Sequence, residues 1–152
     1  MAVRAIPDGY TSLTPYLVCK GAAKAIDFYR NAFGAEETVR MPGPDGQVMH
    51  AEVKIGNAML MLADENPQRG ALSPESIGGT ASSIMFYCDD VDAVFRRAVS
   101  LGATSEVEPT DQFWGDRMAN LVDPFGHKWA IATHKEDVSP EEMMKRMQAM
   151  GA

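Results

Sequence analysis

The chain has 152 residues, a formal net charge of −7 and a pI near 4.9. Its length suits one domain with a core of its own, and its 45% hydrophobic and 23% charged residues are typical of a globular protein. The acidic balance argues against a nucleic-acid partner, which needs a basic surface. The sequence has no apolar run long enough to cross a bilayer and no signal pattern at its start, so we expect no membrane partner. Two cysteines in no metal-binding spacing favour reduced thiols and a cytoplasmic location.

The first half of the chain reads as a strand, a helix and three further strands. Residues 13–19 form a short apolar run typical of a strand, although Pro15 confines that strand to an edge or a bulge. An apolar stripe with helical spacing predicts a helix at 22–33, which ends at Gly34. The three further strands are expected at 38–41, 48–55 and 58–63. Along 48–55, apolar Met49, Ala51, Val53 and Ile55 alternate with polar His50, Glu52 and Lys54, which predicts a strand with its apolar face buried.

The second half repeats this order. Residues 66–80 are rich in Pro, Gly and Ser and predict a linker that can also cover a cleft as a flap. A strand is expected at 83–88, followed by a helix that begins after Asp89 or Asp90 and ends at Gly102. Three strands are then expected near 106–108, 117–122 and 128–133.

A last helix is expected at 139–152, because Ser139, Pro140 and Glu142 form a strong helix start. We expect its methionine stripe to dock on the body or on a partner subunit, and the stripe comprises Met143, Met147 and Met150.

The repetition predicts the architecture, because each unit must bury its apolar face against something. We expect a single domain over 1–138, built from module one at 12–65, the linker at 66–80 and module two at 81–135. The fold class is α+β, with two tandem βαβββ modules forming a mostly antiparallel sheet around a cleft. Function should therefore be sought on the side of the sheet that faces the cleft.

Several motifs resemble the vicinal oxygen chelate superfamily, which includes glyoxalase I, bleomycin-resistance proteins, fosfomycin-resistance enzymes and extradiol dioxygenases. They are Ala-Ile-Asp-Phe-Tyr at 25–29, Phe-Gly-Ala-Glu at 33–36, Phe-Trp-Gly-Asp-Arg at 113–117 and Asp-Pro-Phe-Gly-His at 123–127. Within the superfamily the chain resembles the PhnB-like proteins most closely, over residues 12–134. The resemblance implies a U-shaped sheet and a homodimer, but it names no reaction, because the fold is shared by different chemistries.

The resemblance also implies where metal ligands would lie, on the first and last strands of each module. The four matching positions are Thr14, about Leu60, Ser83 and Ala130. None is an imidazole or a carboxylate, and hydroxyl groups are poor ligands for Zn, Ni or Fe. We therefore predict no cofactor and no metal site at the usual place.

A divalent metal remains an alternative because of His50 and Glu52. Both lie on one face of the expected strand 48–55, about 7 Å apart by strand geometry. Such a pair can bind a metal or act as acid and base, and these two residues are the candidate catalytic residues. The other interpretation is a half-buried histidine satisfied by its neighbour. A metal would need further ligands, and the matching strand offers only Asn120 and Val122.

The expected lining of the cleft is apolar, with aromatic rings and a few hydroxyl groups, which is typical of a site for a small organic molecule. Its predicted members are Thr14, Tyr16, His50, Leu60, Ser83, Met85, Tyr87, Trp114, Asn120 and Ala130. The alternative is that the cleft is filled by its own side chains. Trp114 in particular can either stack on a ligand or cover the core.

Other polar groups are expected to be structural. Arg117 is interpreted as a partner for a charge across the sheet rather than as a group that binds an anion. His127 is expected to be exposed, and His134 to be a helix or interface contact. Cys19 and Cys88 fall on the face that the helices cover, which predicts inert buried thiols.

Three functions follow from these observations. The first and favoured one is a metal-independent protein that binds a small, partly aromatic molecule in the cleft, with dimerisation required. The second is a metal-dependent lyase, isomerase or dioxygenase that uses His50 and Glu52, with the metal as a Lewis acid. The third is a non-catalytic structural homodimer, in which the cleft is packed shut.

Overall fold

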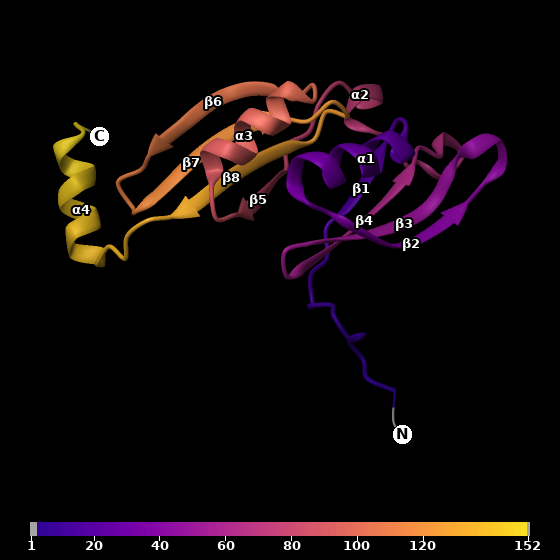
Figure 1. The fold of residues 1–152 in the computed structure, drawn as a ribbon, viewed down its shortest axis with the longest axis horizontal. Helices are drawn as coiled ribbons and strands as arrows, with labels where there is room; N and C mark the ends of the chain where they lie inside the picture. Colours follow the sequence, from indigo (N-terminus) through magenta and orange to yellow (C-terminus); the bar gives the residue numbers. More distant parts are fainter. Residues whose placement is uncertain (1–2, 152) are drawn as a thin grey trace.

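The computed structural model describes residues 3–151 as two modules of the same construction, followed by a helix (Figure 1). The first module comprises β1 (Tyr16–Cys19), α1 (Ala22–Phe33), β2 (Glu36–Pro42), β3 (Val48–Ile55) and β4 (Ala58–Asp64). The second module comprises β5 (Ser83–Tyr87), α3 (Val91–Ser100), β6 (Thr104–Asp111), β7 (Asp116–Val122) and β8 (Lys128–His134). The segment between them contains the short helix α2 (Pro74–Ile77), and the chain ends with α4 (Pro140–Ala149).

Each module contains its own four-stranded sheet. The strand orders are β1-β4-β3-β2 and β5-β8-β7-β6. In both sheets the first strand pairs in parallel with the last one, and the other pairings are antiparallel. The α+β fold with two tandem βαβββ modules and a C-terminal helix is therefore confirmed.

The register of the strands defines which positions of the two modules match. Tyr16 lies opposite Met61, and Met61 lies opposite Glu52. The matching row in the second module runs from Met85 through Ala130 to Asn120. Glu52 is therefore matched by Asn120, and His50 by Met118, one pair away from the match that the sequence suggested.

The helices cover one face of each sheet and join the modules through an aromatic cluster. Tyr29 and Phe33 of α1 pack against Trp129 of β8, with ring centroids 5.4 and 4.7 Å apart. Phe33 also contacts Phe86 of β5 at 5.4 Å. Since Tyr29 and Trp129 are almost fully buried, this cluster forms the core where the two modules meet.

A buried carboxylate lies beside this cluster. Asp123 accepts hydrogen bonds from the Tyr29 hydroxyl at 2.6 Å and from Trp129 Nε1 at 2.9 Å. It also accepts bonds from the backbone N–H groups of Phe125 and His127. These donors satisfy a carboxylate that would otherwise be costly to bury. The aspartate of the Asp-Pro-Phe-Gly motif is thus a connection between α1 and the last turn of module two.

The last strand of each module also holds the start of that module's helix. Asp64 at the end of β4 accepts from the N–H groups of Gly21 and Ala22 at 3.0 and 2.8 Å. At the matching place on β8, the Thr133 hydroxyl accepts from Val91 N–H at 2.8 Å. The first N–H groups of a helix lack partners within the helix, so both side chains act as caps.

The structure corrects the bounds of several expected elements. The first strand begins at Tyr16 rather than Leu13, which is 87% exposed. The strand expected at 106–108 runs from Thr104 to Asp111. Within the linker, Ser73 caps α2, so this segment is partly helical.

The C-terminal helix lies apart from both sheets, beyond the turn between β6 and β7 (Figure 1). Ser139 caps it as the sequence predicts, and its side chain accepts from Glu142 N–H. The segment that leads to it is held by Gly115, whose carbonyl accepts from Lys135 and Glu136 N–H. No residue of α4 is buried, and Met150 is exposed. The expected docking of the methionine stripe on the body is therefore incomplete.

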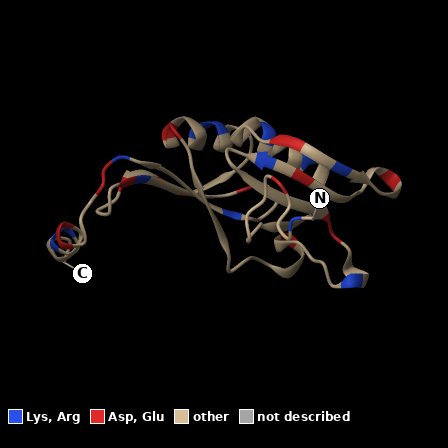
Figure 2. Ribbon diagram, turned by 90° about the horizontal axis from the view of Figure 1, so that it is seen from below, with Lys and Arg blue, Asp and Glu red and all other residues tan. Residues whose placement is uncertain are grey.

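The described chain has no helix long and apolar enough to cross a membrane. Acidic and basic residues occur on the same elements within residues 3–151 (Figure 2).

Candidate functional site

The face of each sheet that the helices leave uncovered, called the open face here, presents aromatic and apolar side chains. On the first sheet Tyr16 is 51% exposed. On the second sheet Met85 and Tyr87 are 43% and 58% exposed. Large apolar side chains that are this exposed and lie side by side on strands indicate a surface that binds a ligand or another protein.

A pocket of about 390 Å³ lies on the open face of the first module. Its walls come from β1, β4, the start of β3 and the segments at 44–47 and 65–71. The lining residues are Tyr16, Val18, Pro44, Gln47, Val48, Met49, Ala63, Asp64, Glu65, Asn66, Arg69 and Ala71. The linker thus forms one wall of this pocket. The sequence predicts the same segment, 66–80, as a flap over a cleft.

A chain of four polar side chains begins at the wall of this pocket. The Tyr16 hydroxyl lies 2.9 Å from His50 Nδ1, and His50 Nε2 lies 3.0 Å from Glu52 Oε1. Glu52 Oε2 accepts a hydrogen bond from the hydroxyl of Tyr10. The strand register explains the arrangement, because Tyr16 and Glu52 lie in one row across Met61 while His50 lies in the next row.

The carboxylates that line the pocket are already engaged with backbone donors. Asp64 caps α1 and also accepts from Val48 N–H at 2.7 Å. Glu65 accepts from Ser73 N–H at 2.7 Å. Hydrogen bonds from the side chains of Ser73 and Ser76 and from the Ser73 backbone lower the pKa of Glu65 to about 2. Arg69 has no ion-pair partner among residues 3–151, so its guanidinium is available at the rim of the pocket.

The second module has a different polar cluster, centred on Asp116. This carboxylate is almost fully buried and accepts from Tyr87 at 2.9 Å, Trp114 Nε1 at 3.1 Å and His134 Nδ1 at 2.7 Å. Burial alone would raise the pKa of Asp116, but the bonds from His134, Tyr87 and Trp114 outweigh it and lower that pKa. Bonds to Asp116 and to Asp137 in turn raise the pKa of His134.

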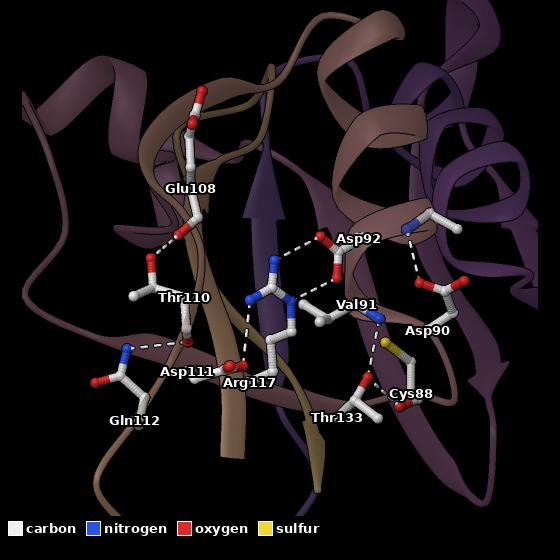
Figure 3. A network of polar contacts seen from close by, with 11 residues as sticks. Cys88, Asp90, Val91, Asp92, Glu108, Thr110, Asp111, Gln112, Arg117 and Thr133 are labelled. Atoms are coloured by element: carbon white, nitrogen blue, oxygen red, sulfur yellow. Dashed lines mark hydrogen bonds and ion pairs between the residues drawn. The ribbon is translucent and has the colours of Figure 1, made fainter. Parts of the chain in front are cut away.

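Arg117 joins β7 to α3 (Figure 3). Its Nε and one terminal nitrogen donate to the two oxygens of Asp92 at 2.7 and 2.9 Å, and its other terminal nitrogen donates to Asp111 at 3.2 Å. The side-chain bonds to Asp92 and Asp111 raise the pKa of the guanidinium. The expected structural role of Arg117 is confirmed by these ion pairs.

The structure divides the predicted cleft lining between two sheets. Tyr16 and His50 lie on the first open face, whereas Met85, Tyr87 and Ala130 lie on the second. The remaining predicted members are Thr14, just before β1, Ser83 at the start of β5, Trp114 before β7, and Asn120 in the middle of β7.

Leu60 is on the wrong face for the role that the sequence gave it. It is 3% exposed and belongs to the core, because alternation along β4 turns it toward α1. Its neighbours Met59 and Met61 occupy the open face instead. The groove that contacts both modules, between Pro15, Met59 and Phe86, has a volume of only about 70 Å³.

Two further expectations concern His127 and the cysteines. His127 is half-buried rather than exposed, since its Nε2 lies 2.9 Å from the carbonyl oxygen of Val18 in the other module. Cys19 is fully buried and Cys88 partly so, and neither forms a disulfide. Burial is the main cause that raises the pKa of both thiols, which makes them poor nucleophiles as expected.

A metal would need at least three suitable ligands at one place. The described residues contain no group of three His, Cys, Asp or Glu side chains that could hold a metal ion. His50 and Glu52 are only two such side chains, and each already bonds to the other and to a tyrosine.

Sequence reasoning missed Tyr10, Met49, Asn66 and Arg69. Tyr10 precedes every strand, and nothing in the local pattern indicates that its hydroxyl reaches Glu52. Alternation predicts Met49 on the buried face, but the strand register shifts at a β-bulge between Met41 and Pro42, and Met49 is exposed. For Asn66 and Arg69 the sequence offers one indication, because it predicts a flap at 66–80.

The chain matches known proteins over most of its length. A family model described as the Glyoxalase/Bleomycin resistance protein/Dioxygenase superfamily matches residues 10–131. The uncharacterized protein Mb0911c of Mycobacterium bovis is 43% identical over 143 residues, which cover 92% of this chain and 94% of that protein. The anthracycline biosynthesis protein DnrV of Streptomyces peucetius is 33% identical over 121 residues, which cover 79% of this chain and 40% of that protein.

A solved structure supports the same assignment. TioX from Micromonospora sp. ML1 superposes with a TM-score of 0.65 at 25% sequence identity, covering 82% of this chain and 98% of TioX. The residues that the family model matches, 10–131, include Tyr10, Tyr16, His50 and Glu52 of the first open face. The chain therefore belongs to the glyoxalase/bleomycin resistance protein/dioxygenase superfamily.

Proposed function

We propose that this protein binds a small, partly aromatic organic molecule in the pocket on the open face of module one, without a metal. The pocket itself carries the proposal. A volume of about 390 Å³ lies in the range of small-molecule sites. Val18, Met49 and Ala63 supply apolar walls, and the Tyr16 ring supplies an aromatic one. The relative named for anthracycline biosynthesis supports a small organic ligand.

Binding of defined probes tests the proposal. We would titrate the protein with 8-anilinonaphthalene-1-sulfonate, phenylpyruvate and 2-tetralone by calorimetry and follow the melting temperature. Ala63→Phe places a ring in the pocket and should abolish binding, because Ala63 lines it. Ala130→Phe adds the same ring to the last strand of module two, outside this pocket, and should leave binding unchanged.

Each outcome has a defined meaning. Loss of binding in both variants would mean that the ligand binds in a cleft lined by both modules, rather than in the pocket of module one. A failure of all three probes to bind or to raise the melting temperature would favour the structural homodimer instead. A stoichiometric divalent ion in protein purified without chelator would contradict metal independence and favour the enzyme that uses His50 and Glu52.

We also propose that the protein is a homodimer, since apolar side chains of both open faces, including Met85 and Tyr87, are exposed in the single chain. Light scattering after size-exclusion chromatography measures the mass, and a monomer would contradict this.

The proposed assignment to the PhnB-like subgroup rests on the motifs at 25–29 and 33–36. A cytoplasmic location rests on the two thiols, which are not joined by a disulfide.

A further inference from the structure

The polar chain beside the pocket fixes where its protons lie. The Tyr16 hydroxyl lies 2.9 Å from His50 Nδ1, and it donates to this nitrogen when the imidazole is neutral, because the single ring proton is then on Nε2, facing Glu52. The carboxylate of Glu52 accepts only, so His50 Nε2 carries the proton and donates at 3.0 Å. His50 is therefore held as one tautomer, with its basic nitrogen aimed at the oxygen of Tyr16.

The same chain runs from the protein toward the pocket. The side chains of Glu52 and His50 are 15% and 23% exposed, whereas Tyr16 is 51% exposed and lines the pocket. Tyr10 holds the second oxygen of Glu52, which fixes the orientation of the carboxylate. A carboxylate that orients an imidazole, which in turn faces a hydroxyl, is the arrangement that activates hydroxyl groups in enzymes.

We propose that Tyr16 is a catalytic residue that transfers protons to and from the molecule bound in this pocket, with His50 and Glu52 as positioning residues. This proposal rests on the proposed binding function and adds a reaction to it. The reaction class is the tautomerisation of an enolisable carbonyl compound.

The proton transfers balance without any co-reactant. The Tyr16 oxygen takes a proton from the carbon beside the ligand's carbonyl group while its own proton passes to His50 Nδ1. The C–H bond breaks, its electron pair forms the enolate, and Glu52 stabilises the imidazolium. The imidazolium then returns the proton through Tyr16 to the enolate oxygen, which forms the enol and restores the starting state of the protein.

The charges at the pocket narrow the ligand class. Asp64 and Glu65 are occupied by backbone N–H groups, whereas Arg69 has no ion-pair partner among residues 3–151. An exposed guanidinium favours a carboxylate. The ligand class is thus a 2-oxo acid or a similar enolisable carbonyl compound with an apolar or aromatic part.

Deuterium exchange tests the proposal. Phenylpyruvate is incubated with the protein in D₂O, and the loss of its CH₂ signal is followed by proton NMR. Tyr16→Phe keeps the ring but removes the hydroxyl, so it should retain binding and lower the exchange rate by about 100-fold. Thr110→Val removes a hydroxyl from the edge strand of module two and should stay within about twofold of the unmodified protein.

A double-variant comparison tests the relay. His50→Gln should lower exchange about as much as Tyr16→Phe, and the double variant should show no further loss, because the two residues act as a unit. Independent, multiplying losses would contradict the relay. Nitrogen-15 NMR of His50 should find the proton on Nε2, and a proton on Nδ1 would also contradict it.

Binding and exchange are measured on the same samples, so the two proposals fail separately. Phenylpyruvate that binds but exchanges equally fast with the unmodified protein and with Tyr16→Phe would refute proton transfer and leave binding intact. If phenylpyruvate does not bind while 8-anilinonaphthalene-1-sulfonate or 2-tetralone does, the proton transfer to a 2-oxo acid is refuted and the binding proposal stands. If none of the three probes binds, the binding proposal fails as well.

Discussion

The open faces of the two modules have the same backbone and different chemistry. On the first, one row carries Tyr16 and Glu52, and its neighbour carries His50. On the second, the matching positions are Met85, Asn120 and Met118. The strand order, the pairing and the capped helix are repeated, but the chain of tyrosine, histidine and glutamate occurs in one module. The duplication therefore specifies a frame, and the side chains of the open face decide which copy carries the site.

The turn before the last strand also differs between the modules. In module one, Ile55 pairs with Ala58, so that two residues form the turn. In module two, Val122 pairs with Lys128, so that five residues form it. The longer turn begins with Asp123, which reaches Tyr29 of module one. The longer turn of module two therefore supplies the residue that links the two modules.

The largest effect is expected from breaking that connection. Asp123→Ala leaves the Tyr29 hydroxyl and Trp129 Nε1 buried without an acceptor, and should lower the free energy of unfolding by about 3–5 kcal/mol. Tyr29→Phe removes one of the four donors and should cost about 1.5 kcal/mol. Urea denaturation measures both. A loss below that of Tyr29→Phe would mean that Asp123 does not connect the modules.

Asp123 shows what can and what cannot be predicted from the sequence. The motif at 123–127 identified the turn, and alternation placed Ala51 and Val53 in the core, where both are fully buried. The partner of Asp123 is Tyr29, which comes from the other module, and no local pattern encodes a contact over that distance. The repeat therefore predicted both modules, whereas their mutual packing is a tertiary property.

The candidate site was predicted in part for a similar reason. Alternation placed His50 and Glu52 on one face, and the structure joins them to Tyr16. The prediction that Leu60 lines the cleft is wrong by one position, because side chains on neighbouring strand residues point to opposite faces. The prediction that Met49 is buried is wrong because a bulge changes the alternation, and no local pattern in the sequence indicates this bulge. Tyr10 and Arg69 lie outside the strands, where periodicity gives no information.

The helix caps are expected to have the next largest effect. Asp64→Ala removes an acceptor for Gly21, Ala22 and Val48 and should cost about 2 kcal/mol. Thr133→Val keeps the shape of the side chain at the matching position and should cost about 1 kcal/mol, since one helix N–H loses its acceptor. Urea denaturation of both variants measures the difference. Equal losses would mean that the two caps do the same work despite their different numbers of bonds.

The residues after these caps should give the two modules opposite pH dependence. Glu65 follows Asp64, and its pKa is lowered from 4.5 to about 2, so its contribution to stability is present above pH 4.5 and is lost as pH falls toward 2. His134 follows Thr133, and bonds to Asp116 and Asp137 raise its pKa above 6.5. Its contribution is fully present below pH 6.5 and is lost as pH rises through the raised value.

Two variants separate these pH windows. Glu65→Gln should flatten the acid side of the stability profile, and His134→Gln should flatten the side above pH 6.5. Both effects are small, because the two groups are accessible to solvent, so denaturation is measured at closely spaced pH values. If His134→Gln left the profile unchanged above pH 6.5, the bonds to Asp116 and Asp137 would contribute nothing to stability.

The smallest effect is expected from the element that module one lacks. A chain that ends before Ser139 loses α4, none of whose residues is buried. The helix is held mainly by Arg146, which bonds to Glu136 at 2.8 and 2.9 Å. Such exposed ion pairs contribute little to stability, because solvent screens the two charges. The shortened chain should therefore unfold within about 1 kcal/mol of the full chain. A larger loss at one protein concentration that disappears on dilution would mean that α4 packs on a second copy, because dilution weakens only contacts between chains.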